Sequence, residues 1–363
     1  MQSRTCKDRE PLLGLIRLAL GAKETLPFCL SSKEWTDFLS VLQQQGIIAV
    51  VMNGISKFNA SDLGITSDIL FKWVGKALAV ETMLKMKFEH EKEFAQRMWE
   101  RNIPVVVLKG SAFGRYYPKP ETRECGDLDC FMLGKKTEGD LATVAIGGKM
   151  KDGGYKHSHL FYKGLTIENH QYLTSFDNTK TGVKAERLLQ GLIVEKCSTI
   201  GTTCLLTPSP FFNAFFLIKH ANRHFVKEGI NLRYLVDWYF FLKAEQYNID
   251  WEKMFLMMKD CHIYNFACVM TALCIEELGL NEVVPLLHEA AVKCDKDMCR
   301  KVLDDIFERH PPFLQENVSQ KILRICRRFR RMWKYRFLAD ETYLRLVWNT
   351  LIYNSVISGK AKL

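Results

Sequence analysis

IPVVVLKGSAFGRYYPKPETRECGDLDCFM, residues 103–132, is the stretch of sequence that decides the fold. It opens with an apolar, β-branched run over residues 104–108, and Gly110 follows that run. Such a run between Pro and Gly predicts a buried strand. A short helix is expected over residues 111–117, and a second strand over residues 127–133. The stretch therefore predicts a strand–turn–helix–strand unit at the centre of an α+β fold.

The second predicted strand begins with two acids, in the order Asp127-Leu128-Asp129. Side chains alternate across a strand, so Asp127 and Asp129 share one face and Leu128 takes the other. Two carboxylates on one face repel each other unless a positive charge lies between them. Mg²⁺ prefers hard oxygen ligands of this kind. The pair is therefore a candidate metal site.

The turn before the short helix has chemistry of its own. Gly110 allows the backbone to approach a ligand closely, and the N–H groups at a helix start favour phosphate. A phosphate-binding turn and a pair of metal-binding acids on neighbouring strands are the two halves of a nucleotide-dependent phosphoryl site. A P-loop is excluded, because the spacing of Gly110 and Gly114 is wrong and no Lys-Ser/Thr follows.

These motifs together carry a resemblance to a known group of enzymes. The matching residues, in chain order, are Leu108-Lys109-Gly110, Tyr117-Pro118-Lys119-Pro120, Arg123 and Asp127-Leu128-Asp129. The set resembles the nucleotidyltransferase superfamily that includes DNA polymerase β and the aminoglycoside nucleotidyltransferases. It is closer still to the family 5 nucleotidyltransferase-like proteins of bacteria.

The resemblance implies transfer of a nucleoside monophosphate from an NTP, ATP in the first place, to a hydroxyl-bearing acceptor on a small molecule or protein. Pyrophosphate leaves, and one or two Mg²⁺ ions take part. The implied catalytic and metal-binding residues are Asp127, Asp129 and Glu168, and the implied nucleotide-binding residues are Lys109, Gly110, Ser111 and Arg123. Lys109 ends its strand, so its side chain either contacts phosphate or points away from the site.

Glu168 is the third acid that the resemblance implies, on a strand beside the acid pair. The family pattern is Glu-x-His followed by an aromatic residue, and this chain has Glu168-Asn169-His170-Gln171. Glu168 and His170 match, whereas Asn169 replaces an apolar residue and Gln171 replaces the aromatic one. Besides metal binding, a solvated acid in mid-strand remains an alternative for Glu168.

The composition is that of an ordinary globular protein. The chain has 363 residues, of which 47% are hydrophobic and 25% charged. No apolar run approaches the roughly 18 to 20 residues that span a bilayer, and residues 12–22 are expected to form an amphipathic helix. Twelve cysteines occur without zinc-site spacing. With no export signal, we expect reduced thiols and a cytoplasmic protein.

Three domains are expected: a helical region over residues 1–102, a nucleotidyltransferase core with a small mixed sheet over 103–206, and a helical domain over 207–363. The last boundary is placed at the Pro-rich segment 207–210. Ser31 and Glu34 predict a capping box. Further helices are predicted over 66–102, 137–151, 211–224 and 231–242, and a hairpin over 155–162 and 165–173.

The net charge of +10 is concentrated near the C-terminus. Eight basic residues lie in the segment 321–336: Lys321, Arg324, Arg327, Arg328, Arg330, Arg331, Lys334 and Arg336. Without these eight, 43 of the 51 basic residues remain, against 41 acidic ones. Three interpretations are open for this segment: an amphipathic helix docked on the domain, a grip on RNA, or a contact with an anionic membrane surface.

The helical half offers one more candidate group. Arg233 and Asp237 are four residues apart and can pair on one helix face, as a structural ion pair. Alternatively, His220, His224 and Arg233 face the cleft and touch the acceptor or the nucleotide. Three functions therefore compete: an active nucleotidyltransferase, a non-catalytic nucleotide-binding or partner-binding protein of the same fold, and an RNA-terminal nucleotidyltransferase.

Overall fold

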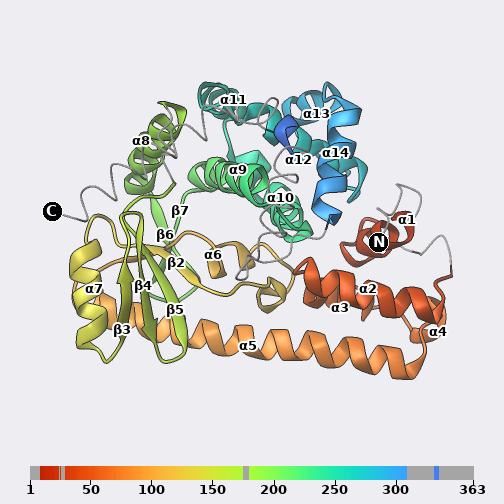
Figure 1. The fold of residues 1–363 in the computed structure, drawn as a ribbon, viewed down its shortest axis with the longest axis horizontal. Helices are drawn as coiled ribbons and strands as arrows, with labels where there is room; N and C mark the ends of the chain where they lie inside the picture. The colour runs from red at the N-terminus through yellow and green to blue at the C-terminus, as the bar shows by residue number, and fades with distance from the viewer. Residues whose placement is uncertain (1–8, 24, 26–28, 175–179, 309–330, 335–363) are drawn as a thin grey trace, which may run out of the picture.

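The structure, a computed structural model, describes residues 9–23, 25, 29–174, 180–308 and 331–334. A mixed sheet lies towards one end of the molecule, and helices cover both of its faces and extend away from it (Figure 1). The predicted α+β class, with helical segments before and after a mixed sheet, is confirmed.

The sheet has seven strands in the order β3-β4-β5-β2-β1-β7-β6. Their bounds are β1 Val105–Val107, β2 Leu128–Phe131, β3 Lys149–Gly153, β4 His157–Tyr162, β5 Leu165–His170, β6 Cys197–Thr199 and β7 Leu205–Pro208. β2 runs antiparallel to β1 and parallel to β5. In the β2–β5 register, Asp129 lies opposite Glu168, so the central strands bring two of the predicted acids together.

The N-terminal helices lie beyond the sheet, except the last of them, which also passes along it (Figure 1). They are α1 Glu10–Ala19, α2 Ser32–Gln44, α3 Ile48–Ile55, α4 Ala60–Leu63 and α5 Ser67–Trp99. The Ser31–Glu34 capping box is present at the start of α2. The long helix α5 runs beneath the whole molecule (Figure 1), and its Phe94 and Met98 join Val105 and Leu128 in one buried cluster. The helix α7, Lys136–Ala145, adds to this cover.

The opposite face of the sheet packs against the C-terminal helices. These helices are α8 Lys180–Glu195, α9 Pro210–Lys227, α10 Leu232–Glu245, α11 Trp251–Asp260, α12 Tyr264–Glu276, α13 Pro285–Val292 and α14 Lys296–Phe307. Three short elements complete the chain: α6 Ser111–Gly114 and η2 Pro120–Thr122 between β1 and β2, and η3 Gln246–Asn248 after α10. Val106, Leu108 and Phe131 share a buried cluster with Phe212 of α9. The same cluster also includes residues of the N-terminal helices, so it crosses the predicted domain boundaries. The domain limits stay a prediction.

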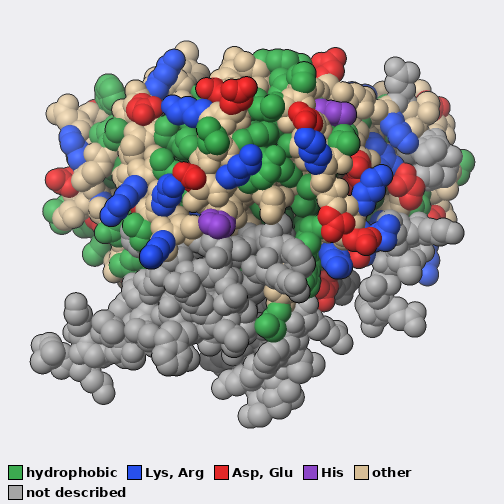
Figure 2. Space-filling model, turned by 90° about the horizontal axis from the view of Figure 1, so that it is seen from above, with side chains coloured by type: hydrophobic (Ala, Val, Ile, Leu, Met, Phe, Trp, Pro, Cys, Tyr) green, Lys and Arg blue, Asp and Glu red, His purple; other side chains and the backbone are tan. Residues whose placement is uncertain are grey.

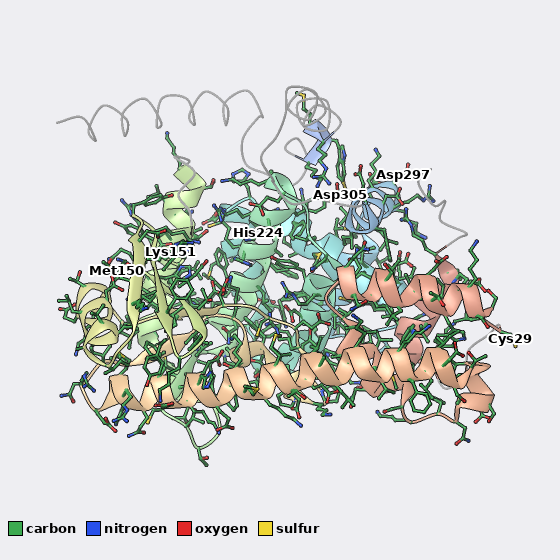
Figure 3. The ribbon with its side chains drawn as sticks, turned by 60° about the horizontal axis from the view of Figure 1, so that its bottom comes forward. Cys29, Met150, Lys151, His224, Asp297 and Asp305 are labelled. Carbon is green, nitrogen blue, oxygen red and sulfur yellow. The ribbon has the colours of Figure 1, made fainter. Side chains whose placement is uncertain are left out.

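Two local predictions are wrong. The helix predicted over 137–151 ends at Ala145, and Lys149–Gly153 is the edge strand β3, on which Met150 and Lys151 are exposed (Figure 3). The cause is Gly147, which has φ 93°, a conformation that ends helices. The helix predicted over 111–117 is a single turn that ends at Gly114. The strands β6 and β7 were not predicted, because residues 197–208 carry little apolar alternation.

Most of the basic segment 321–336 lies outside the described residues. Within residues 331–334, Arg331 Nη2 lies 3.0 Å from Asp305 Oδ1, and Lys334 Nζ lies 2.5 Å from Asp305 Oδ2. Lys334 is fully buried and also donates to the Phe225 carbonyl at 2.8 Å. Asp305 lies on α14 (Figure 3). These four residues therefore dock on the helical half, as the first of the three interpretations expects.

No helix in the described part of the chain is long and apolar enough to cross a membrane. Over the face seen in Figure 2, Lys and Arg side chains lie interspersed with Asp and Glu, and hydrophobic side chains fill the space between them. This mixture agrees with a nearly neutral body outside the segment 321–336.

A buried ion pair fastens the segment 103–132 to α10. Arg123 donates from Nε and Nη2 to the two Asp237 carboxylate oxygens, each at 2.8 Å, and both side chains are about 5% exposed. The Tyr117 hydroxyl donates to the same carboxylate at 2.7 Å. The predicted pairing of Arg233 with Asp237 is wrong, because Arg233 donates instead to the Glu124 carbonyl at 2.7 Å. Asp237 is structural, but its partner comes from across the fold.

The substitution Asp237→Asn leaves the Arg123 guanidinium buried without its counter-charge. Breaking one side of a buried pair costs about 3–5 kcal/mol, so we expect the free energy of unfolding in urea to fall by about that amount. Glu289→Gln removes one side of the exposed Glu289–Lys293 pair on α13 and should change it by no more than about 1 kcal/mol. Equal effects of the two variants would contradict a structural role for the Arg123–Asp237 pair.

Candidate functional site

The predicted acids lie on the sheet face that looks towards α9. Leu128, Cys130 and Ile167 belong to the cluster under α5, so the side chains of Asp129 and Glu168, which alternate with them, point to the other face. Asp127 directly precedes β2 and is exposed, whereas Asp129 is buried. Asp129 and Glu168 thus share one face by strand alternation, and the charges of both act on Asp127.

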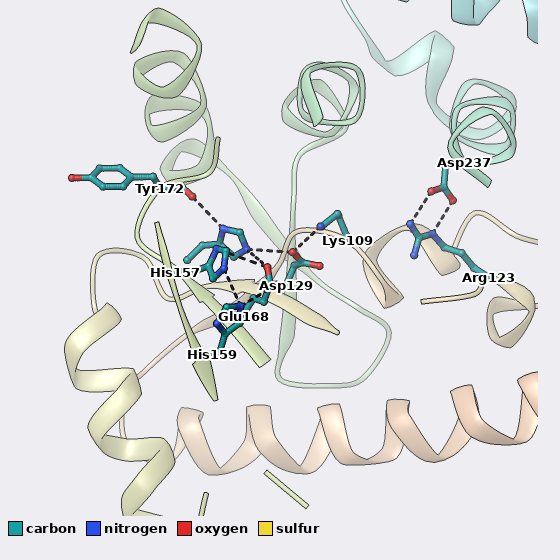
Figure 4. A network of polar contacts seen from close by, with 9 residues as sticks. Lys109, Arg123, Asp129, His157, His159, Glu168, Tyr172 and Asp237 are labelled. Carbon is teal, nitrogen blue, oxygen red and sulfur yellow. Dashed lines mark hydrogen bonds and ion pairs between the residues drawn. The ribbon is translucent and has the colours of Figure 1, made fainter. Parts of the chain in front are cut away.

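Asp129, the most buried of these acids, contacts a lysine and a histidine (Figure 4). Its Oδ1 lies 2.7 Å from Lys109 Nζ and 3.2 Å from His170 Nε2. Burial alone would raise the pKa of this carboxyl, but Lys109 and His170 outweigh it and hold the pKa well below its usual range. Asp129 is therefore ionised at neutral pH. Of the two orientations considered for Lys109, its side chain takes the one towards the acids.

The ionised forms of Asp127 and Glu168 are less strongly stabilised by their surroundings than that of Asp129. Burial, together with the charges of Glu168 and Asp129, raises the pKa of Asp127, and Lys109 and Lys87 offset this only in part. A hydrogen bond from His170 lowers the pKa of Glu168 against the opposing effect of burial. The charges of Asp129 and Glu168 thus act on Asp127, and a group of carboxylates that repel one another suits a cation.

Histidines from β4 surround Glu168. Across the β4–β5 pair, His159 lies opposite Glu168 and His157 lies opposite His170. Glu168 Oε2 is 3.4 Å from His170 Nε2 and 3.9 Å from His157 Nδ1, and Glu168 Oε1 is 3.5 Å from His159 Nε2. Burial is the main cause that lowers the pKa of His157 to about 4, so this ring is neutral at pH 7.

His157 and His159 were not among the predicted site residues. Their alternation on the strand that precedes Glu168 and His170 in a hairpin could have identified them, because paired strands with matching alternation present such side chains on one face. Among the described residues, His157, Glu168 and His170 form a group whose ligand atoms all lie within 4.8 Å of one another. Asp127 and Asp129 lie beside this group and not in it.

The turn at Gly110 lies next to the acids. Gly110 has φ 62° and ψ −120°, a backbone conformation that residues other than glycine rarely adopt. The Ser111 hydroxyl is buried and has no hydrogen-bond partner. Lys87, which forms an ion pair with Glu91 on α5, lies so close that a Cβ on Gly110 would be 3.9 Å from its Nζ. Two cations, Lys87 and Lys109, therefore flank the turn.

A second basic group comes from β4 and α9. A small cavity of about 10 Å³ is lined by Lys156, Leu173, Thr174, Phe216, Lys219, His220 and Arg223. Burial lowers the pKa of Lys156 to about 8, with a further contribution from Arg223 and Lys109. Of the histidines considered earlier, His220 lines this cavity, and His224 lies 3.3 Å from Glu228. Sequence patterns could not show that Lys156 and Arg223 meet here.

A family model described as an uncharacterised nucleotidyltransferase matches residues 31–279 of the chain. The chain belongs to this family. The match extends from α2 to the residues after α12 and so includes the Gly110 turn, both aspartates and Glu168. No curated protein and no solved structure matches the chain.

Arg123 is the one predicted site residue that the structure does not bring to the others. Figure 4 shows its pairing with Asp237 apart from the contacts around Asp129 and Glu168. Its Nε and Nη2 groups both donate to the Asp237 carboxylate. The remaining predicted residues, which are Lys109, Gly110, Ser111, Asp127, Asp129 and Glu168, lie together on one side of the sheet.

Lys156 provides a pH-dependent test of the basic group. Its amine is protonated below pH 8 and loses its charge above it, because its pKa is lowered to about 8. We expect affinity for ATP, measured by calorimetry, to fall as the pH rises from 7 to 9. Lys156→Met should bind ATP more weakly and lose this fall, and comparison with the parent cancels the titration of ATP itself. Lys151→Met, on the exposed edge strand, should keep the parent profile. A parent-like profile in Lys156→Met would remove Lys156 from the site.

Proposed function

We propose that this nucleotidyltransferase transfers a nucleoside monophosphate from an NTP to a hydroxyl group of a small molecule or protein and releases pyrophosphate. The observation that supports the proposal most directly is the placement of three acids, Asp127, Asp129 and Glu168, beside the Gly110–Ser111 turn. Acids for a metal ion and cations for phosphate are the parts that such a transfer needs.

The acids fit a hard divalent cation. Asp127 and Asp129 supply oxygen ligands of the kind that Mg²⁺ prefers, and Glu168 completes the set. Burial raises the pKa of Asp127, the charges of Glu168 and Asp129 raise it further, and a bound cation would relieve that repulsion. When bound, one or two Mg²⁺ ions would neutralise phosphate charge and lower the pKa of the acceptor hydroxyl.

The phosphates would contact the cations beside the turn. Lys109 directly precedes Gly110, and its Nζ lies 2.7 Å from Asp129, so we assign it to the leaving pyrophosphate. Lys87 Nζ lies close to Gly110, and the buried Ser111 hydroxyl has no hydrogen-bond partner. The cavity under α9 is too small for a nucleotide, so we assign its basic wall, Lys156 and Arg223, to the outer phosphates. Arg123 has no part in this assignment, since Asp237 occupies it.

Glu168 is the candidate general base. Its carboxylate has a lowered pKa and is ionised at neutral pH, so it can accept the proton of the acceptor hydroxyl. The acceptor oxygen then forms a bond to the α-phosphorus, the bond from that phosphorus to the β-phosphate oxygen breaks, and pyrophosphate leaves. The transfer needs alignment and charge neutralisation more than covalent participation by the protein.

The acids are tested by Asp127→Asn, Asp129→Asn and Glu168→Gln, in an assay for pyrophosphate release from ATP with pooled metabolite and protein acceptors. Each variant should lose at least about 100-fold in rate, because each removes charge stabilisation at the reacting phosphate. Asp297→Asn, at an exposed position on α14, is the matched control and should keep the parent rate. Release that persists in all three acid variants would refute the assignment, and nucleotide binding without release in the parent would favour a non-catalytic member of the family.

A further inference from the structure

The histidines on β4 and β5 have ring nitrogens that could bind a metal ion and that have no role in the proposed transfer. His157, His159 and His170 bring three imidazole rings to one carboxylate, that of Glu168. The ring centroid of His157 lies 4.7 Å from that of His159 and 5.0 Å from that of His170. Histidine rings so close together require an account of where their protons are.

The proton on His170 can be placed from its neighbours. Its Nδ1 lies 3.1 Å from the Tyr172 carbonyl oxygen, which can only accept, so Nδ1 carries the proton. The other ring nitrogen, Nε2, faces two carboxylates, Asp129 at 3.2 Å and Glu168 at 3.4 Å. Both of those oxygens are acceptors as well. His170 is 3% exposed, and a cation bound among the three atoms would take the place of a proton on Nε2.

The same reasoning applies to the two histidines of β4. His159 Nδ1 lies 2.7 Å from Asp152 Oδ1 and donates to it, which leaves His159 Nε2 as an acceptor. His157 Nε2, at 3.1 Å, must then donate to it. The remaining nitrogen, His157 Nδ1, is unprotonated, buried and without a hydrogen-bond partner, and it faces Glu168 Oε2 at 3.9 Å.

We infer that His157 Nδ1, His170 Nε2 and Glu168 form a binding site for a divalent transition-metal ion, Zn²⁺ in the first place. Each of the three residues offers a ligand atom within 4.8 Å of those of the other two, and both named nitrogens face Glu168 Oε2, at 3.9 Å and 3.4 Å. Two imidazole nitrogens and one carboxylate oxygen suit Zn²⁺ and Mn²⁺ and are a poor set for Mg²⁺. The carbonyl that fixes the His170 ring is the kind of outer partner that metal-bound histidines have.

This site is distinct from the acids proposed to hold Mg²⁺, although the two share Glu168. An ion bound there would join the hairpin β4–β5 through His157 and His170, and it would fix the orientation of Glu168 next to Asp129. Its binding requires no nucleotide and no turnover. The inference can therefore fail while the proposed function stands, and the converse also holds.

The test is calorimetric titration of the full-length protein with Zn²⁺, Mn²⁺ and Mg²⁺ separately, without nucleotide, after treatment with a chelator. We expect Zn²⁺ to bind most tightly, with one ion per chain, and Mg²⁺ to bind at least about 100-fold more weakly than Zn²⁺. His157→Gln and Glu168→Gln should each weaken Zn²⁺ binding at least about 100-fold. Asp152→Asn, which removes an outer contact of the cluster, should weaken it about tenfold.

The control is His288→Gln, at an exposed position on α13, which should bind Zn²⁺ as the parent does. His157 is less buried than His170, and a thermal melt of His157→Gln without metal establishes that it folds. Zn²⁺ binding that is no tighter than Mg²⁺ binding, or that survives in folded His157→Gln, would overturn the inference.

Discussion

The repulsion between Asp129 and Glu168, which the parallel register of β2 and β5 places opposite each other, is the constraint on which the rest of the site depends. Two carboxylates on adjacent strands are unfavourable unless positive charge surrounds them. Lys109 and His170 supply that charge at Asp129, and three histidines surround Glu168. Asp127 adds a third negative charge at the open side. The fold thus maintains an arrangement of three carboxylates that repel one another.

The fold maintains it through packing on both faces of the sheet. On one face, α5 buries the apolar partners of the acids, such as Leu128, and this fixes which side chains point towards α9. On the other face, α9 brings Arg223 against the sheet beside Lys156. The Arg123–Asp237 pair fastens the segment between the two strands to α10. Stability and chemistry are therefore carried by different charged residues of the same short stretch.

Strand alternation and motif order were enough to predict the acids, the Gly110 turn and the sheet-plus-helices class, because these depend on residues close in sequence. Contacts between distant segments were beyond such patterns. Nothing local shows that Arg123 pairs with Asp237 and not with phosphate, or that Lys87 in the middle of α5 reaches the Gly110 turn. The edge strand β3 was taken for helix, because its residues are exposed and lack an alternating pattern. His157 and His159 could have been found, since their spacing matches that of Glu168 and His170.

The most direct measurement of the central claim is the affinity of the parent protein for a non-hydrolysable NTP analogue, with and without Mg²⁺. If the acids and the basic turn form one site, Mg²⁺ should raise nucleotide affinity at least about tenfold, and the nucleotide should raise Mg²⁺ affinity by the same factor. Asp129→Asn should abolish this coupling. Equal nucleotide affinity with and without Mg²⁺ would contradict the account, since the acids would then have no part in binding the nucleotide.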